Sequence, residues 1–169
     1  MRAFAQAGAE LAAEEPLARF ARLQAEAVAD AGEPVVYWRA RGEVRPGATG
    51  SQPTIWLHLQ VRASLPLACQ RCLGPVDTGL DVDRWFRFVA DEAAAAVEDE
   101  DSEEDVLALE PRPSLRELIE DELLMELPLV PMHEACPQAL GHSNPVDGLP
   151  SSEEAPKRHP FAELARLKK

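Results

Sequence analysis

The strongest constraint on the fold is a strict alternation of apolar and polar side chains in residues 55–62. Every second residue from Ile55 to Val61 is aliphatic, and the residues between them are aromatic, polar or charged. Successive side chains of an extended chain point to opposite faces, so this period of two predicts a strand with one buried face. The chain must therefore contain a sheet that carries its core on one side.

Two neighbouring segments continue this pattern and predict a small antiparallel sheet of three or more strands. Residues 35–41 form the first expected strand, and residues 80–89 form the third, after a turn at residues 73–75. Loops rich in glycine and proline separate the strands, as hairpin connections require. Arg84 interrupts the apolar side of the third strand, which predicts a bulge or an edge position there.

Two helices are expected to pack on this sheet. Residues 16–31 form the first, with a proline in its first turn, an apolar stripe and Gly32 after its end. Alanine- and glutamate-rich residues before it would extend it. The second begins at Ser114, which can form a capping box with Glu117, and must end near Pro128. The pattern therefore predicts an α+β fold.

The negative charge of the chain is concentrated in one segment. The formal net charge is -13, but residues 91–110 hold ten acids and no bases, which leaves 20 acids, 17 bases and a net charge of -3 elsewhere. Because such a segment repels itself, we expect a flexible acidic insert. Seven of the 15 prolines lie in residues 128–160. We therefore expect one domain in residues 1–133, followed by an extended, low-complexity tail, residues 134–169, that ends in a short amphipathic segment.

The composition and the motifs that are missing exclude several classes of protein. The chain shows no export signal and no long apolar stretch, and its three cysteines do not resemble a secreted disulfide framework, which predicts a cytoplasmic protein without membrane contact. It has no glycine-rich phosphate loop, no His-Glu-x-x-His and no Gly-x-Ser-x-Gly motif. We therefore expect an accessory protein rather than an enzyme, with no small-molecule substrate.

Two residue pairs have the spacing of zinc ligands. Cys69 and Cys72 form a Cys-x-x-Cys pair, and His133 and Cys136 form a second pair with the same spacing. Together they would make a tetrahedral Cys₃His zinc site that ties the C-terminal segment to the sheet. The alternative is a packing pair of cysteines and a surface histidine. A redox role is disfavoured, because the first cysteine follows a strand and does not begin a helix.

One face of the predicted sheet collects aromatic rings and arginines. Residues 35–90 hold seven arginines against four acids, the reverse of the whole-chain balance. On a sheet, aromatic rings can stack RNA bases while arginines neutralise phosphates. The predicted RNA-binding residues are Tyr37, Arg39, Arg41, Trp56, His58, Arg62, Trp85 and Arg87. The alternative is that a helix covers this face and the tryptophans form a second packing layer.

Three segments occur in the order found in a known family. They are residues 69–73 (Cys-Gln-Arg-Cys-Leu), residues 118–133 (Leu-Ile-Glu-Asp-Glu-Leu-Leu-Met-Glu-Leu-Pro-Leu-Val-Pro-Met-His) and residues 160–168 (Pro-Phe-Ala-Glu-Leu-Ala-Arg-Leu-Lys). With the acidic spacer between the first two, the chain from about Val35 onward resembles the YceD family of bacterial large ribosomal RNA accumulation proteins. The resemblance implies a ribosome-biogenesis factor that supports synthesis, processing or stability of the large-subunit (23S) rRNA. It supplies no catalytic residues.

Two kinds of partner follow from this resemblance. The aromatic and arginine face would contact ribosomal RNA directly. The acidic insert would instead attract a basic large-subunit ribosomal protein by electrostatic steering, and the chain would then be an interaction module without RNA contact. A third interpretation of the insert is a solvated linker that has no partner.

Overall fold

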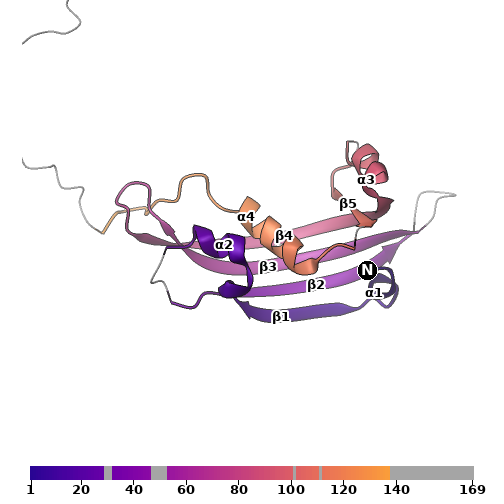
Figure 1. Cartoon of the computed structure of the whole chain (residues 1–169), viewed down its shortest axis with the longest axis horizontal. Helices are drawn as coiled ribbons and strands as arrows, with labels where there is room; N and C mark the ends of the chain where they lie inside the picture. Colours follow the sequence, from indigo (N-terminus) through magenta and orange to yellow (C-terminus); the bar gives the residue numbers. More distant parts are fainter. Residues whose placement is uncertain (29–31, 47–52, 101, 111, 138–169) are drawn as a thin grey trace, which may run out of the picture. The chain divides into compact units, whose positions relative to one another are not determined.

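The computed structural model describes residues 1–28, 32–46, 53–100, 102–110 and 112–137. Its centre is a five-stranded sheet with the strand order β1-β2-β3-β4-β5 (Figure 1). The strands are β1 (Glu10–Pro16), β2 (Val35–Arg45), β3 (Thr54–Ala68), β4 (Pro75–Asp91) and β5 (Asp105–Glu110). The first four are antiparallel neighbours, whereas β5 is parallel to β4. The α+β fold is confirmed, and the sheet is mixed rather than purely antiparallel.

The helices lie on both faces of the sheet. On the core face pack α1 (Arg2–Gln6), α2 (Ala21–Glu26) and α4 (Leu115–Met125), and α2 and α4 lie side by side in Figure 1. On the other face, α3 (Glu92–Asp99) packs against β4 and β5. None of the helices in the described ranges has the length and apolar character needed to cross a membrane.

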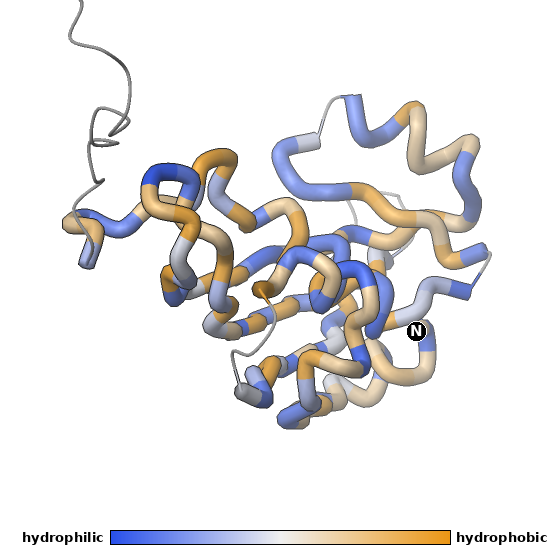
Figure 2. The backbone as a smooth tube through the Cα atoms, turned by 60° about the vertical axis from the view of Figure 1, so that its left-hand side comes forward, coloured by the Kyte–Doolittle hydropathy of each residue, from blue (hydrophilic) through white to orange (hydrophobic). Residues whose placement is uncertain are grey.

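The core is the apolar side of the alternation seen in the sequence. Ile55, Leu57, Leu59 and Val61 are all buried, and Figure 2 shows the alternation along the strands. The helices and the residues that flank them complete the core, with side chains that include Phe20, Leu23, Ile119 and Leu123. Burial of each such side chain contributes about 1.5–3 kcal/mol, whereas an exposed ion pair contributes about 0–1 kcal/mol. The apolar layer therefore determines how the elements pack.

The predicted helix over residues 16–31 is correct only in part. Residues 21–26 are helical and residues 17–19 form a 3₁₀ turn, whereas residues 10–16 form β1. Residues 29–31 lie outside the described residues. The helix propensity of alanine and glutamate is worth less than 1 kcal/mol per residue. Continuous backbone pairing with β2, from Glu10↔Arg41 to Pro16↔Val35, outweighs it.

The acidic segment, expected to be a flexible insert over residues 91–110, contains a helix and a strand. Asp91 caps α3 by accepting a hydrogen bond from the N–H of Ala94, and β5 continues the sheet beside β4. Ala95, Val106 and Ala108 are buried between α3 and the sheet, while most of the acids point outward. These small apolar residues allow the segment to pack on the sheet, although its high charge predicted a flexible insert.

Arg84 causes neither a bulge nor an edge position. The β3–β4 register runs without interruption from Ile55↔Phe88 to Ala68↔Pro75, and β5 covers the other side of β4. On the core face, Arg84 makes ion pairs with Asp105 and Glu122, each at 3.2 Å. The predicted bulge is therefore wrong, because acids of β5 and α4 accommodate the charge.

The chain divides into a unit of residues Met1–Pro137 and a second unit of residues Gln138–Lys169. The predicted domain, residues 1–133, ends four residues before the first unit does. The second ligand pair, at positions 133 and 136, therefore belongs to the folded unit. The predicted extended tail and its amphipathic end fall, from residue 138 onward, outside the described residues.

Candidate metal centre and exposed sheet face

The two predicted ligand pairs meet beside the turn between β3 and β4. Each of Cys69, Cys72, His133 and Cys136 offers one ligand atom, and these atoms all lie within 4.8 Å of one another. The Sγ atoms of Cys69 and Cys136 are 4.0 Å apart, and Cys72 Sγ is 3.4 Å from His133 Nδ1. Sulfur ligands about 2.3 Å from a tetrahedral zinc ion would lie roughly 3.8 Å apart. This cluster can hold a metal ion.

The turn itself brings the first pair together. The N–H of Cys69 donates to the carbonyl of Gly74 at 2.9 Å, and the N–H of Leu73 donates to the carbonyl of Cys69 at 2.8 Å. Leu73 adopts a φ of 60°, in the left-handed region that costs a non-glycine residue about 1–2 kcal/mol. The chain thus holds a strained turn that places Cys72 beside Cys69.

The second pair reaches the turn through backbone contacts that follow α4. The N–H of Gln70 donates to the carbonyl of Pro131 at 2.9 Å, and the N–H of His133 points to Cys69 Sγ at 3.5 Å. The sequence spacing predicted these ligands, but their convergence depends on the path of the chain after α4.

The thiols of the cluster differ in acidity. Burial raises the pKa of Cys69, but hydrogen bonds from the backbone N–H groups of Cys72, His133 and Arg71 outweigh it and lower this pKa to about 5. The N–H of Gly74 lowers the pKa of Cys72, whereas burial and the neighbouring thiols raise it, with a net increase. With its pKa of about 5, Cys69 is a thiolate at neutral pH, and the thiolate is the form that binds a metal.

The eight residues predicted to bind RNA share the face of the sheet opposite the core. Tyr37 lies opposite Arg62 and His58 lies opposite Trp85 in the strand register. In the described part of the chain, helix α3 is the element that covers this face, and it does so only near β4 and β5. The expected grouping of side chains therefore exists, and its accessibility differs from one end to the other.

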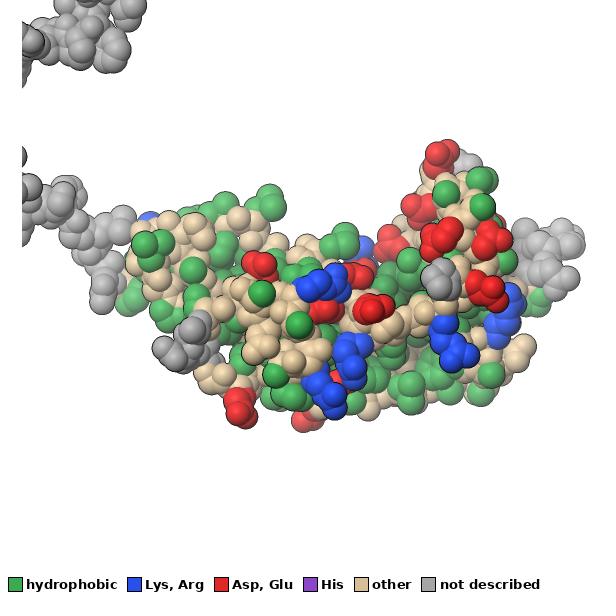
Figure 3. All heavy atoms as spheres, viewed as in Figure 1, with side chains coloured by type: hydrophobic (Ala, Val, Ile, Leu, Met, Phe, Trp, Pro, Cys, Tyr) green, Lys and Arg blue, Asp and Glu red, His purple; other side chains and the backbone are tan. Residues whose placement is uncertain are grey.

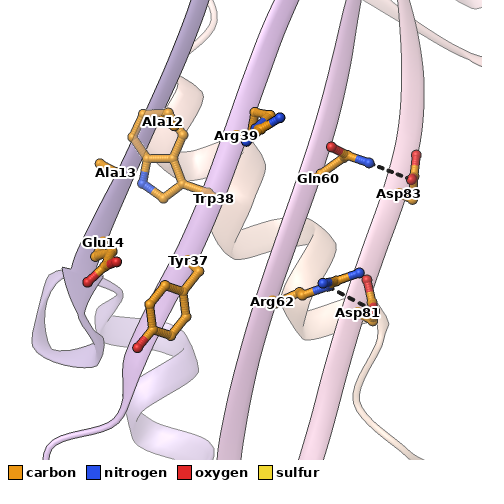
Figure 4. A pocket seen from close by; sticks show the side chains of 10 residues that line it. All are labelled: Ala12, Ala13, Glu14, Tyr37, Trp38, Arg39, Gln60, Arg62, Asp81 and Asp83. Atoms are coloured by element: carbon orange, nitrogen blue, oxygen red, sulfur yellow. Dashed lines mark hydrogen bonds and ion pairs between the residues drawn. The ribbon is translucent and has the colours of Figure 1, made fainter.

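The most open part of this face surrounds Tyr37. A shallow pocket of about 480 Å³ lies there, and the lining side chains include Tyr37, Arg39, Gln60, Arg62, Asp81 and Asp83 (Figure 4). Tyr37 is 50% exposed and the Arg62 side chain is 76% exposed. The neighbouring strand β1 lines the pocket with Ala12, Ala13 and Glu14, and Glu14 lies opposite Tyr37 in the strand register.

Carboxylates pair with the basic groups of this open part. Glu10 lies 3.6 Å from Arg39, Asp81 lies 3.2 Å from Arg62, and Asp83 lies 2.6 Å from His58. Hydrogen bonds from the Gln60 amide and then from His58 lower the pKa of Asp83. Acids on β1 and β4 thus flank the arginines of β2 and β3 and neutralise much of their charge.

The tryptophan end of the face is occupied by protein groups. The Arg45 guanidinium lies 4.2 Å from the ring centre of Trp56 and 4.0 Å from that of Trp85, and the His58 ring stacks on Trp85 at 4.3 Å. Sequence reasoning missed Arg45, although its spacing of two from Arg41 through Glu43 placed it on the same face. The stacked arginine and histidine leave less ring surface for a ligand.

Arg87 lies on the same face but is covered by the acidic segment that follows β4. It pairs with Glu98 and Glu104, donates to Ser102 at 2.6 Å, and its side chain is only 14% exposed. These partners belong to α3 and to the connection that leads to β5. Arg87 therefore holds this acidic segment against the sheet.

Comparison with known proteins gives the same family from a family model and from a curated relative. The family model described as "Large ribosomal RNA subunit accumulation protein YceD" matches residues 57–168, a range that contains all four members of the cysteine–histidine cluster. A curated relative from Haemophilus influenzae, which carries the same description, is 34% identical over 126 residues, or 69% of this chain and 67% of the relative. No solved structure matches the chain.

Proposed function

Because the chain belongs to the YceD family of large ribosomal RNA subunit accumulation proteins, we propose that it is a cytoplasmic accessory factor for the large-subunit ribosomal RNA. It would support the synthesis, processing or stability of that RNA. The names of the family and of the relative state accumulation of the large ribosomal RNA subunit, and this supports the proposal. The match also confirms the resemblance to the family.

The factor acts by binding rather than by catalysis in this proposal. The Cys₃His cluster already offers four protein ligands, so a tetrahedral metal held there would have no open position for a substrate or a reactive water. The exposed sheet face offers paired charges and aromatic rings, which suit recognition.

The charge pattern favours a basic large-subunit ribosomal protein as the partner. Phosphate binding needs basic groups that are free to release counterions, whereas Arg39 and Arg62 already have carboxylate partners and the chain carries a net charge of -13. Acidic side chains gather over α3 in Figure 3, on a segment held firmly to the sheet. Such a surface steers a basic protein toward it.

Binding of the full chain to purified basic large-subunit proteins and to rRNA fragments tests this proposal at about 50 and 200 mM salt. The variant replaces Glu92, Glu100 and Glu103 by Gln, because these exposed acids have no ion pair among the described residues. We expect weaker, less salt-dependent binding of the ribosomal protein. The control replaces Glu26 and Glu126 by Gln and Asp77 by Asn, with the same change in charge. Equal effects of variant and control would contradict a site at α3.

Direct RNA contact is the second candidate. The exposed ring of Tyr37 beside Arg39 and Arg62, with Arg41 further along β2 on the same face, favours it. Replacing the three arginines by Gln should then remove salt-sensitive binding to rRNA fragments in a filter assay, while Arg87 stays in place to hold α3. Replacing Arg2, Arg19 and Arg112 is the matched control. Unchanged RNA binding in the first variant would remove this face as an RNA site.

We also propose that the ion held by the Cys₃His cluster is Zn²⁺. Three thiolates and an imidazole form a donor set that zinc prefers, and the spacing of the ligand atoms suits its tetrahedral geometry. Elemental analysis of protein purified without chelators should find one zinc per chain, and less in Cys72→Ser and His133→Ala. A fully folded protein that contains no metal would refute the assignment.

A further inference from the structure

The second ligand pair lies in a segment that has neither helix nor strand. Residues 127–137 follow α4 as bends and irregular chain, so no regular backbone ladder holds His133 and Cys136 in place. A metal site nevertheless needs its four ligands within a few tenths of an ångström of the correct geometry. The groups that hold this segment to the β3–β4 turn therefore decide how well the site is formed.

Arg71 makes most of these contacts. Its Nη2 donates to the carbonyl of His133 at 2.5 Å and to that of Glu134 at 3.3 Å, and its Nε donates to Cys136 Sγ at 3.1 Å. Arg71 lies between the two cysteines of the first pair in the sequence. One side chain of the turn thus grips both residues of the second pair with the planar fork of its guanidinium.

The charge of the site points to the same residue. Three thiolates and a neutral imidazole around a divalent cation carry a net charge of -1. The guanidinium supplies one positive charge directly beside the Cys136 sulfur. Hydrogen bonds from outer groups orient metal ligands and stabilise coordinated thiolates, and their loss typically reduces metal affinity by about 10–100-fold.

We propose that Arg71 is the positioning residue that closes the metal centre. It neutralises the coordinated Cys136 thiolate and fixes the two carbonyl groups that orient the second ligand pair. This inference rests on the proposed zinc site and makes that site a closed structural centre, whose coordinated sulfurs are shielded from reaction.

Competition with a chromophoric chelator measures the zinc affinity of the full chain and of its Arg71→Met and Arg71→Lys variants. We expect about a 10–100-fold lower affinity for Arg71→Met. Arg71→Lys keeps the charge but not the fork, so its affinity should lie between the other two. The control is Gln70→Met, because the Gln70 side chain donates only to the carbonyl of Ala68 and does not touch the second pair.

The alkylation rate of Cys136 by iodoacetamide in the zinc-loaded proteins is the second measurement. It should rise in Arg71→Met, because the hydrogen bond that lowers the nucleophilicity of the coordinated sulfur is lost, and stay unchanged in Gln70→Met. Tryptophan fluorescence verifies that each variant is folded.

The outcomes separate this inference from the zinc assignment itself. Zinc bound equally tightly by the wild type and by Arg71→Met would overturn the role of Arg71 and leave the zinc site standing. Equal losses in Arg71→Met and Gln70→Met would also overturn it, because the effect would then come from the turn as a whole. A wild-type chain that binds no zinc would overturn both proposals.

Discussion

Glu120 shows how one buried side chain can join two helices that are distant in the sequence. Phe20, at the N-terminus of α2, provides no side-chain cap. The Glu120 carboxylate, from α4, instead accepts hydrogen bonds from the N–H groups of Arg22 at 2.7 Å and Leu23 at 3.2 Å, and from Arg22 Nε at 2.9 Å. An acid near a helix N-terminus also interacts favourably with the helix dipole. Its burial is therefore compensated by well-placed donors.

Replacing Glu120 by Gln should lower the free energy of unfolding at neutral pH by about 1–3 kcal/mol, since charged hydrogen bonds are lost. Burial raises the pKa of Glu120, but the donors of Leu23 and Arg22 outweigh it and lower the pKa below its ordinary value of 4.5. Its contribution is therefore complete above pH 4.5 and is lost as the pH falls through the folded-state pKa. Urea unfolding of both proteins from pH 3 to 7 measures this.

Both proteins contain Glu122, whose pKa is raised mainly by burial, so this residue destabilises the fold as the pH rises. Subtracting the unfolding free energies of the two proteins cancels the contribution of Glu122 and leaves that of Glu120. The stability gap should narrow as the solution becomes more acidic. A gap that stays constant from pH 3 to 7 would show that the carboxylate charge has no part in the cap.

The packing of α1 on β2 depends on the absence of a side chain at one position. Gly42 is buried, and a Cβ added to it would lie 2.5 Å from Phe4 Cδ1 and 2.8 Å from Ala5 Cα. Because the second neighbour is backbone, the helix itself would have to shift. Close approach, rather than an unusual backbone angle, explains the glycine.

Gly42→Ala should therefore reduce the free energy of unfolding by about 1–3 kcal/mol, as overpacked sites do. Gly79→Ala is the control, because a Cβ at Gly79 meets no atom within 4 Å. Denaturant titration of both variants compares them directly. Equal stability of the two variants would mean that α1 does not pack as tightly as described.

The packing of α3 and β5 on the sheet depends on the ion pairs and the hydrogen bond of Arg87. Arg87→Met should increase amide hydrogen exchange in α3 and β5 and leave β1–β3 protected, since Glu98, Ser102 and Glu104 lose their common partner. Arg62→Met removes an exposed pair on the same face and is expected to change little. Exchange that is unaltered in α3 would assign the anchoring to Ala95, Val106 and Ala108 alone.

The molecule as a whole separates a sheet core from a cluster at the β3–β4 turn. None of the four cluster residues belongs to the described core cluster, which is built from β2, β3, β4 and the helices on one face. Metal at the cluster therefore stabilises the connection between the turn and the chain after α4, and contributes little to the sheet itself. A bound ligand at about 100 times its dissociation constant stabilises a fold by roughly 2.7 kcal/mol.

Chelation of the metal should free residues 127–137 for cleavage by thermolysin while the fluorescence of the tryptophans on the sheet remains unchanged. Addition of zinc should restore protection, and Cys72→Ser should be cleaved with or without zinc. Mass spectrometry of the fragments locates the cuts. Loss of the sheet signal on chelation would instead place the metal at the centre of folding.

Local patterns in the chain were sufficient for the central strands, for the Ser114 cap, which accepts from Glu117 N–H at 3.4 Å, and for the spacing of the two ligand pairs. These features depend on residues within one turn or one strand, where backbone geometry alone relates them. The alternation also placed all eight aromatic and basic residues on one face.

Contacts between distant segments account for everything else. Residues 10–16 form a strand because they pair with β2. The acidic segment is ordered because β5 pairs with β4 and Glu98 pairs with Arg87. Glu120 caps a helix 98 residues away in the sequence. The meeting of Cys69 and Cys72 with His133 and Cys136 belongs to the same class. Such pairings depend on loop closure and on competition among many partners, which no short window of residues encodes.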